Sequence, residues 1–219
     1  MDNSIEKKTP YHIQAYNLIK NDILNHRILG GEKVNETTLS RNFKISRSPV
    51  REALRMLECD RLLVSSPSGL IVNPLPSRDI KELYQCRMMI ESFAASLTAK
   101  KISDEDLTYL SSCIELAETA QKCGEIEDVL KYNTNFHELI VSLCGNNLLQ
   151  NFHNINRNLI ILSRSNEFFQ RNNADYLEEH NSILQALRAH DSSLSEKRVR
   201  RHIQSDLDYY LKYINKKEF

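Results

Sequence analysis

The chain has 219 residues, of which 41% are hydrophobic and 26% charged, and its formal net charge is zero. This is the composition of an ordinary soluble globular protein. No stretch approaches the ~18 apolar residues of a membrane span, and the N-terminus lacks the apolar core of a signal peptide. We therefore expect a cytoplasmic protein without a membrane partner. Five glycines and five prolines are few for this length, which favours helices over a fold with many turns.

The five cysteines lie far apart in the sequence, so they form neither a zinc knuckle nor a disulfide framework, and we expect reduced thiols. The charge is unevenly distributed. Residues 1–75 carry 11 Lys and Arg against 8 Asp and Glu, whereas residues 79–219 carry 17 against 21. A basic head on an acidic body suggests that the head contacts nucleic acid.

The first third of the chain predicts three helices and a hairpin. Apolar residues repeat at helical spacing over residues 10–26, and two glycines end that element. A short helix follows Asn35, which is a suitable N-cap, and a longer one follows Ser46. Two short strands then flank a turn at Ser68 and Gly69. Together these elements predict a winged helix-turn-helix over residues 1–73.

Two prolines mark residues 74–78 as a linker, and the rest of the chain contains no proline after it. Apolar spacing over residues 79–219 predicts six successive amphipathic helices, at about 79–100, 104–122, 126–143, 147–166, 173–189 and 193–215. Six helices of this length predict a compact antiparallel bundle with room for a site in its core. The expected fold is thus mainly α, a winged helix-turn-helix followed by an all-α bundle.

The start of the third helix has the residues of a DNA-reading element. Arg47 and Arg51 lie four residues apart on one face, and a guanidinium can bind guanine through two hydrogen bonds. The hydroxyls of Ser46 and Ser48 suit phosphate oxygens at a helix N-terminus, and Arg41 lies close enough in sequence to add a phosphate contact. On charge alone, the alternative of a solvated basic face stays open.

The run from Asn35 through SRSPVREALRMLE resembles the GntR family of bacterial regulators, and the match covers about residues 12–73. The resemblance implies that Arg47, Ser48 and Arg51 contact bases and phosphates of DNA. It also implies a dimer on a palindromic operator, because the symmetry of the protein is mirrored in its DNA site.

The sequence departs from the family pattern at two places, directly after the recognition helix and at the wing. The sequence Asp60-Arg61-Leu62 stands where the family usually has Glu-Gly-Leu, and the wing tip reads Ser68-Gly69 where Arg-Gly or Asn-Gly is common. Gly69 matches the wing glycine. Because the tip lacks an arginine, we expect it to contact the minor groove more weakly.

Three of the seven histidines lie within the apolar stripes of three different predicted helices: His137, His180 and His202. A single inward histidine is usually a core residue. Three on separate helices of one bundle suggest a metal site, because neutral imidazole binds transition metals and facing helices build such sites. From spacing alone, both alternatives stay open.

Residues 79–215 resemble, more loosely, the FCD ligand-binding domain of the FadR subfamily. The resemblance rests on NTNFH at 133–137, EHNSILQAL at 179–187 and RRH at 200–202. It implies that the three histidines bind a divalent metal such as Zn²⁺, Ni²⁺ or Mn²⁺. Asn133 stands where metal-binding members have Asp, so we expect weaker affinity or another preferred metal. Open coordination positions would let a small organic acid complete the site.

Arg87 lies in the apolar stripe of the first predicted bundle helix, one turn before Glu91. A buried arginine needs a carboxylate partner, so an internal pair between these two residues is one interpretation. The FCD resemblance implies another, in which Arg87 with Glu91 anchors the carboxylate of an effector. Arg157 and Arg164 are weaker candidates, for which solvated positions are expected.

These features predict a homodimeric, sequence-specific DNA-binding regulator, acting as a repressor, whose C-terminal domain binds a small carboxylate beside a metal ion. One alternative is a metal sensor in which the ion itself is the signal. Another is a metal-dependent helical hydrolase, suggested by the adjacent His190 and Asp191. Asp191 lies at a predicted helix junction and serves naturally as an N-cap, and no nucleophile or base has a recognisable spacing. We therefore expect no catalytic residue and no enzyme activity.

Overall fold

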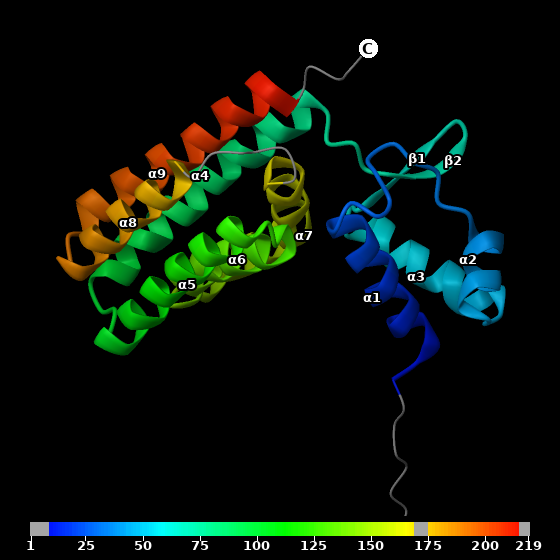
Figure 1. Cartoon of the computed structure of the whole chain (residues 1–219), viewed down its shortest axis with the longest axis horizontal. Coiled ribbons are helices and arrows are strands. Elements are labelled where there is room, and N and C mark those ends of the chain that lie inside the picture. The colour runs from blue at the N-terminus through cyan, green and yellow to red at the C-terminus, as the bar shows by residue number, and fades with distance from the viewer. Residues whose placement is uncertain (1–8, 169–174, 215–219) are drawn as a thin grey trace, which may run out of the picture. The chain divides into compact units, whose positions relative to one another are not determined.

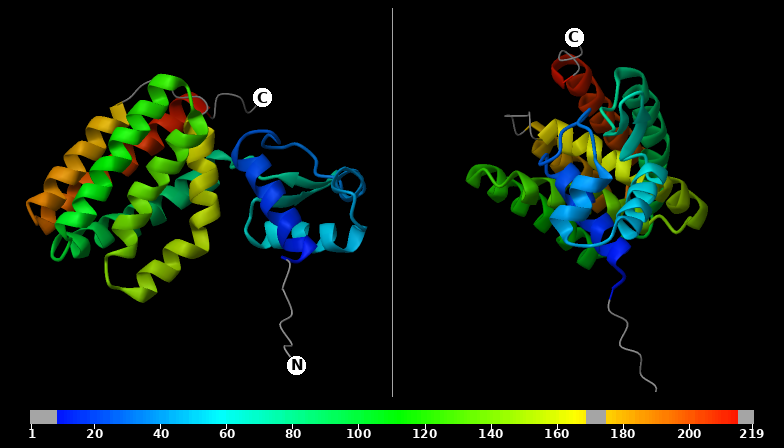
Figure 2. Two further views of the ribbon diagram at one scale, coloured as in Figure 1. Left: turned by 60° about the horizontal axis from the view of Figure 1, so that its bottom comes forward. Right: turned by 90° about the vertical axis from the view of Figure 1, so that its right-hand side faces the viewer.

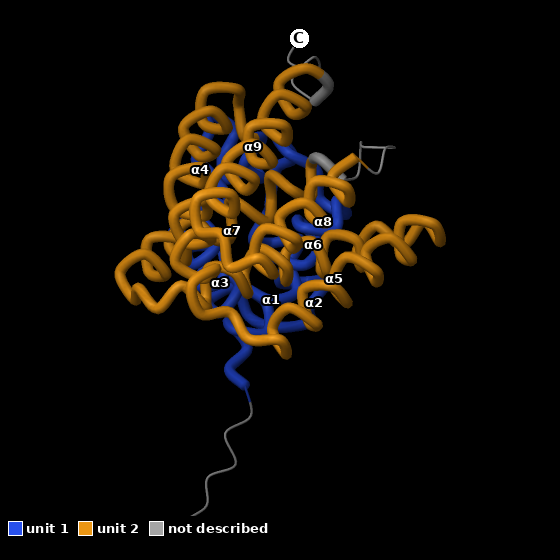
Figure 3. Tube along the Cα trace, turned by 90° about the vertical axis from the view of Figure 1, so that its left-hand side faces the viewer, with its two compact units in different colours: residues 1–74 blue, residues 75–219 orange. Residues whose placement is uncertain are grey.

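The computed structural model describes residues 9–168 and 175–214 (Figure 1). The chain divides into two compact units, residues 1–74 and residues 75–219, which Figure 3 distinguishes by colour. Each unit is described by itself below. The division falls at the two prolines that precede the helical region of the sequence.

The first unit contains three helices and a hairpin: α1 (Tyr11–Leu24), α2 (Glu36–Phe43), α3 (Arg47–Cys59), β1 (Leu63–Ser66) and β2 (Gly69–Val72). The two strands are antiparallel, with Leu63 opposite Val72 and Ser66 opposite Gly69. Gly69 has a φ of 112°, a left-handed value that favours glycine at the end of the tight turn. The predicted winged helix-turn-helix is confirmed.

The core of the first unit is an apolar seam between α1 and α3, which pack against each other. Ile19 and Ile23 of α1 and Val50 and Leu57 of α3 are fully buried, and Leu63 of the hairpin is buried with them. Burying a side chain of this size stabilises a fold by about 1.5–3 kcal/mol. The seam leaves the N-terminal turn of α3 in solvent.

The N-termini of α2 and α3 are capped differently. The side chain of Asn35 accepts hydrogen bonds from the backbone N–H groups of Thr37 and Thr38, at 2.9 and 3.1 Å. Ser46 occupies the N-cap position of α3, but its hydroxyl makes no capping hydrogen bond. The Ser46 hydroxyl therefore does not contribute to holding the N-terminus of α3.

The second unit consists, in its described residues, of helices joined by short connections. Its helices are α4 (Ser77–Ala99), α5 (Asp104–Cys123), α6 (Ile126–Ser142), α7 (Asn147–Phe168), α8 (Asp175–Arg188) and α9 (Ser192–Tyr209), which continues as the π-helical turn η1 (Tyr210–Ile214). The bounds follow those expected from apolar spacing within a few residues. The first helix begins at Ser77, inside the segment 74–78 that the sequence marks as a linker.

The six helices form a bundle around α4 (Figures 1 and 2). The longest helix, α4, lies along α9 and also packs on α6, α7 and α8, while α5 packs on α6 and α8.

The ends of two helices are fixed by capping hydrogen bonds. Ser103 and Asp106 form a reciprocal capping box at α5, and Asp191 caps α9 by accepting a hydrogen bond from Leu194 N–H. The predicted all-α bundle is confirmed. Among the described helices, none is long and apolar enough to cross a membrane.

The contrast between the two N-caps of the helix-turn-helix is testable. Replacing Asn35 with Ala removes the acceptor for two backbone N–H groups, and we expect the opening free energy of α2 to fall by about 0.5–2 kcal/mol. Hydrogen–deuterium exchange of the α2 amides measures this change. The matched control is Ser46→Ala, which removes no capping bond and should leave α3 unchanged. Equal loss of protection in both variants would contradict the assignment.

Candidate functional site

The first candidate site is the exposed N-terminal turn of α3. Ser46, Arg47 and Ser48 are all exposed there, and Arg41 is exposed on α2. This turn therefore offers a guanidinium, two hydroxyls and free backbone N–H groups to a ligand in solvent. That is the arrangement through which a recognition helix contacts the edges of bases and the phosphates of DNA.

Arg51 has a partner within the protein. Its Nε and Nη2 both donate to the carboxylate of Glu36, each at 2.9 Å, which ties the first turn of α2 to α3. The Arg51 hydrogen bond lowers the pKa of Glu36. The pair holds the guanidinium of Arg51 in one orientation beside the exposed turn.

A basic residue that the sequence analysis missed lies at the wing. Lys33 forms an isolated antiparallel bridge with Ile71 of β2, and its Cε would lie 3.4 Å from a Cβ placed on Gly69. Gly69 itself is exposed. A lysine thus stands at the wing tip that carries no arginine of its own, although 36 residues separate the two in sequence.

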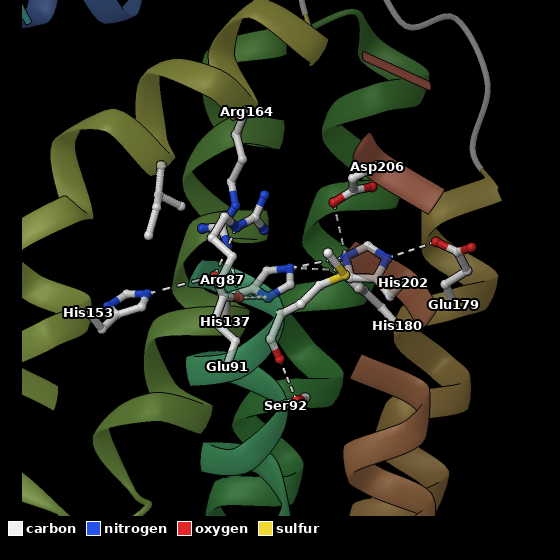
Figure 4. Close-up of polar contacts among 12 residues, drawn as sticks. Arg87, Glu91, Ser92, His137, His153, Arg164, Glu179, His180, His202 and Asp206 are labelled. Atoms are coloured by element: carbon white, nitrogen blue, oxygen red, sulfur yellow. Dashed lines mark hydrogen bonds and ion pairs between the residues drawn. The ribbon is translucent and has the colours of Figure 1, made fainter. Parts of the chain in front are cut away.

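The second candidate site is in the core of the bundle, where three histidines converge from α6, α8 and α9 (Figure 4). His137, His180 and His202 are almost completely buried, and their Nε2 atoms lie 3.2 Å from one another in all three pairs. The ring of His180 is stacked on Phe136, with ring centroids 4.3 Å apart. Side chains that the sequence places on the apolar faces of three separate helices therefore meet at one place in the core.

Carboxylates fix the tautomers of two of these rings from outside. Nδ1 of His137 lies 2.9 Å from Oε2 of Glu91, and Nδ1 of His202 lies 2.7 Å from Oε2 of Glu179. Each Nδ1 therefore carries the proton, and each Nε2 turns a lone pair toward the centre of the cluster. Lone pairs 3.2 Å apart repel unless a cation lies between them. A carboxylate–histidine contact of this kind is the usual support of a metal ligand.

The spacing of the nitrogens fits a metal ion. Zn–N bonds of about 2.0–2.1 Å place ligand nitrogens about 2.8–3.0 Å apart at octahedral angles and about 3.3–3.4 Å apart at tetrahedral angles, so the observed spacing lies between the two. Burial lowers the pKa of His137 to about 3, and the charge of Arg164 adds to this effect against the opposing influence of Glu91. His137 is therefore neutral near pH 7, which is the form that binds metals.

The structure also places an acidic side chain beside the cluster that the sequence analysis did not identify. Oδ2 of Asp206, one turn after His202 on α9, lies 3.4 Å from Nε2 of His202, the nitrogen that faces the cluster. Asn133, one turn before His137 on α6, is buried. The spacing of four residues from a clustered histidine is the only feature of the sequence that marks Asp206.

Two arginines lie next to the histidines and share one carboxylate. Nε of Arg87 donates to Oε1 of Glu91 at 2.9 Å, and Nη2 of Arg164 lies 3.4 Å from Oε2 of the same residue. All three side chains are almost completely buried. The internal pair expected from the sequence is present, and the expectation that Arg164 is solvated is wrong, because α7 packs on α4 at this position.

The carboxylate of Glu91 remains ionised in this environment. Burial alone would raise its pKa, but the charge of Arg87, the hydrogen bond from His137 and the charge of Arg164 hold the pKa well below its usual value. Burial lowers the pKa of Arg164, with a further contribution from the charge of Arg87. Two buried guanidiniums therefore depend on the same negative charge.

The remaining candidates from the sequence have structural contacts. Arg157 pairs with Glu138, both partly exposed. Nδ1 of His190 lies 2.8 Å from the carbonyl oxygen of Ala99, and Asp191 caps α9. The adjacent His190 and Asp191 are thus accounted for by helix ends. His153, which the sequence analysis did not single out, is buried on α7 with its Nε2 3.9 Å from Oε1 of Glu91.

A winged helix-turn-helix with an exposed arginine-bearing third helix, followed by a helical bundle with a polar core, defines a class of DNA-binding transcription regulators. Two family models agree with this class. Residues 13–69 match the bacterial regulatory proteins of the gntR family, and residues 82–205 match the FCD domain. The chain belongs to the GntR family of bacterial transcription regulators and carries an FCD domain.

Individual proteins are similar over most of the chain. The uncharacterized HTH-type transcriptional regulator YdhC of Bacillus subtilis (strain 168) is 33% identical over 97% of this chain and 96% of its own length. The gluconate operon transcriptional repressor of the same organism is 27% identical over 78% of this chain and 73% of its own length. The solved structure of McbR/YncC from E. coli covers 94% of this chain and 99% of its own, with a TM-score of 0.77 and 21% identity.

The burial of the arginines around Glu91 leads to a stability prediction. Replacing Glu91 with Ala leaves two buried guanidiniums without their shared counter-charge, and we expect the free energy of unfolding to fall by about 3–5 kcal/mol in urea denaturation. The control is Glu82→Ala on the same helix, where Glu82 pairs with Arg78 at the same spacing of four residues but in solvent. This variant should denature like the wild type. A small effect of Glu91→Ala would contradict the assignment.

Proposed function

We propose that this protein is a repressor that binds a palindromic operator as a homodimer through residues 1–73. Residues 79–219 bind a small carboxylate effector beside a divalent metal ion. The observation that carries the DNA-binding part is the exposed first turn of α3, in which Arg47 and Ser48 match the positions that contact bases and phosphates in the family. Such a regulator acts in the cytoplasm. The assignment to the FadR subfamily stays a prediction.

An exposed apolar surface on the bundle supports the homodimer. Leu148, Phe152 and Ile155 repeat along one face of α7 and are 60–75% exposed, and Met89 and Phe93 are exposed on the neighbouring α4. Phe152 lines one small pocket together with residues of α4, so the two exposed faces adjoin. A second copy of this face would cover the surface, which is the usual reason for an apolar patch of this kind.

The DNA-binding proposal is tested by selection from random duplexes, followed by affinity measurement at fixed salt. We expect the selected sites to be inverted repeats that bind two chains. Arg47→Ala should weaken binding to them by about ten- to a hundredfold, because it removes a guanidinium that can bind a guanine through two hydrogen bonds. Arg27→Ala is the control, since Arg27 follows α1 and pairs with Asp22. Equal affinity for selected and random DNA would refute sequence-specific binding.

The metal proposal rests on the convergence of three buried Nε2 atoms, each 3.2 Å from the other two. His137, His180 and His202 would hold the ion, with Asn133 as the fourth ligand implied by the family pattern. Zn²⁺, Ni²⁺ and Mn²⁺ all accept imidazole ligands. When bound, the ion would offer open coordination positions to an oxygen of the effector.

Metal content tests this proposal directly. Purified wild-type protein, equilibrated with Zn²⁺ and desalted, should retain about one ion per chain by elemental analysis. His180→Ala should retain almost none, because it removes one of three ligands. His12→Ala in the first unit is the control. Full metal content in His180→Ala would remove the histidine cluster from the metal site.

The effector proposal rests on Arg87. Its Nη1 and Nη2 are buried and make no hydrogen bond with any residue that the structure describes. A carboxylate is the group that satisfies both ends of a guanidinium at once. Two similar proteins are named as repressors of a gluconate operon, and gluconate carries a carboxylate. A sensor of metal alone would need the histidines but would leave these donors without an acceptor.

A further inference from the structure

Glu91 contacts both the buried arginines and the histidine cluster. Its Oε1 accepts from Nε of Arg87, and its Oε2 accepts from Nδ1 of His137 at 2.9 Å (Figure 4). The same Oε2 is also the oxygen that Nη2 of Arg164 approaches, at 3.4 Å. Arg164 from α7 and His137 from α6 therefore share a single acceptor atom on α4.

Three nitrogen atoms of the two arginines have no acceptor in the part of the chain that the structure describes. Nη1 and Nη2 of Arg87 and Nε of Arg164 are buried and find no hydrogen-bond partner there. Asp206 lies close enough for its charge to raise the pKa of both arginines, but these three nitrogens still find none. Buried guanidinium groups in proteins are paired and hydrogen-bonded. Donors of this kind suit an anion with at least two oxygens.

The shared oxygen connects this anion position to the metal position. A carboxylate bound by Arg87 and Arg164 would draw Arg164 away from Oε2 and leave that oxygen to Nδ1 of His137. A stronger bond at Nδ1 makes Nε2 of the same ring a better ligand. The link is reciprocal, because a metal that strengthens the contact between His137 and Glu91 weakens the hold of Oε2 on Arg164.

We infer that Arg164 joins Arg87 in binding one carboxylate of the effector, and that Glu91 is the positioning residue that makes metal and carboxylate bind cooperatively. The inference rests on the proposed function, since it requires both ligands. It adds a second arginine to the carboxylate site and predicts that a monocarboxylate is sufficient for the coupling. Until the acid binds, Arg164 competes with His137 for Oε2 of Glu91 and thereby weakens the binding of the metal.

The test uses the full chain, Zn²⁺ and acetate, which is the smallest carboxylate of this class. The zinc dissociation constant is measured by competition with a chelator, with and without acetate. We expect acetate to tighten zinc binding by about fivefold or more in the wild type. Zinc binding without any effect of acetate would overturn the inference while leaving the metal site in place. Failure to bind zinc at all would refute the metal proposal itself.

The first pair of variants is R164Q and R157Q. Both arginines lie on α7, but Arg157 pairs with Glu138 rather than with Glu91. R164Q frees Oε2 for His137, so it should bind zinc without acetate about as tightly as the wild type does with acetate, and acetate should add little. R157Q should behave as the wild type. Unchanged or weaker zinc binding by R164Q would overturn the inference.

The second pair is E91Q and E179Q, which remove the two carboxylates that contact Nδ1 atoms of the cluster. Both should weaken zinc binding by about tenfold or more. Only E91Q should reduce the tightening by acetate to what direct ligation of the metal supplies, because Glu179 contacts His202 and no arginine of the pair. Full retention of the acetate effect in E91Q would show that acetate acts on the metal alone, without Glu91, and would overturn the inference. Circular dichroism checks that E91Q folds, and R164Q decides the question if it does not.

Discussion

The bundle depends on one buried negative charge, the carboxylate of Glu91. It is the shared partner of guanidiniums on α4 and α7 and of an imidazole on α6. Charges are costly to bury, and a bundle tolerates two arginines in its core only when a carboxylate meets them with hydrogen bonds. The positions of α6 and α7 around α4 are therefore constrained by electrostatics as well as by apolar packing.

The same constraint makes the core receptive to ligands. A core made only of apolar residues would be satisfied without them, whereas this one holds guanidinium donors that find no acceptor among the described residues and gathers three imidazole nitrogens 3.2 Å apart. A cation between the histidines and an anion at the arginines would each complete a set of contacts that is already arranged. Polar networks of this kind are stable only when every member is satisfied. Occupancy of the site is then tied to the packing of the helices that supply it.

The sequence predicted the fold well because the helices and strands depend on local sequence patterns. The apolar period of 3.6 residues, the scarcity of glycine and proline, and capping residues such as Asn35 and Asp191 act over a few residues and set where helices start and stop. The recognition helix was visible for the same reason, since Arg47 and Ser48 lie in one short motif. The stripe positions of His137, His180 and His202 also followed from periodicity.

The tertiary structure decided which of these residues meet. Arg164 appeared solvated from its sequence, and only the packing of α7 on α4 shows that it is buried against Glu91. Asp206 and Lys33 carried no motif, yet they lie beside His202 and Gly69. The apolar period and the capping residues are properties of a few neighbouring residues, and they determined where the helices begin and end. Sharing of one carboxylate by three helices depends on distances between residues up to 73 positions apart, which no local pattern encodes.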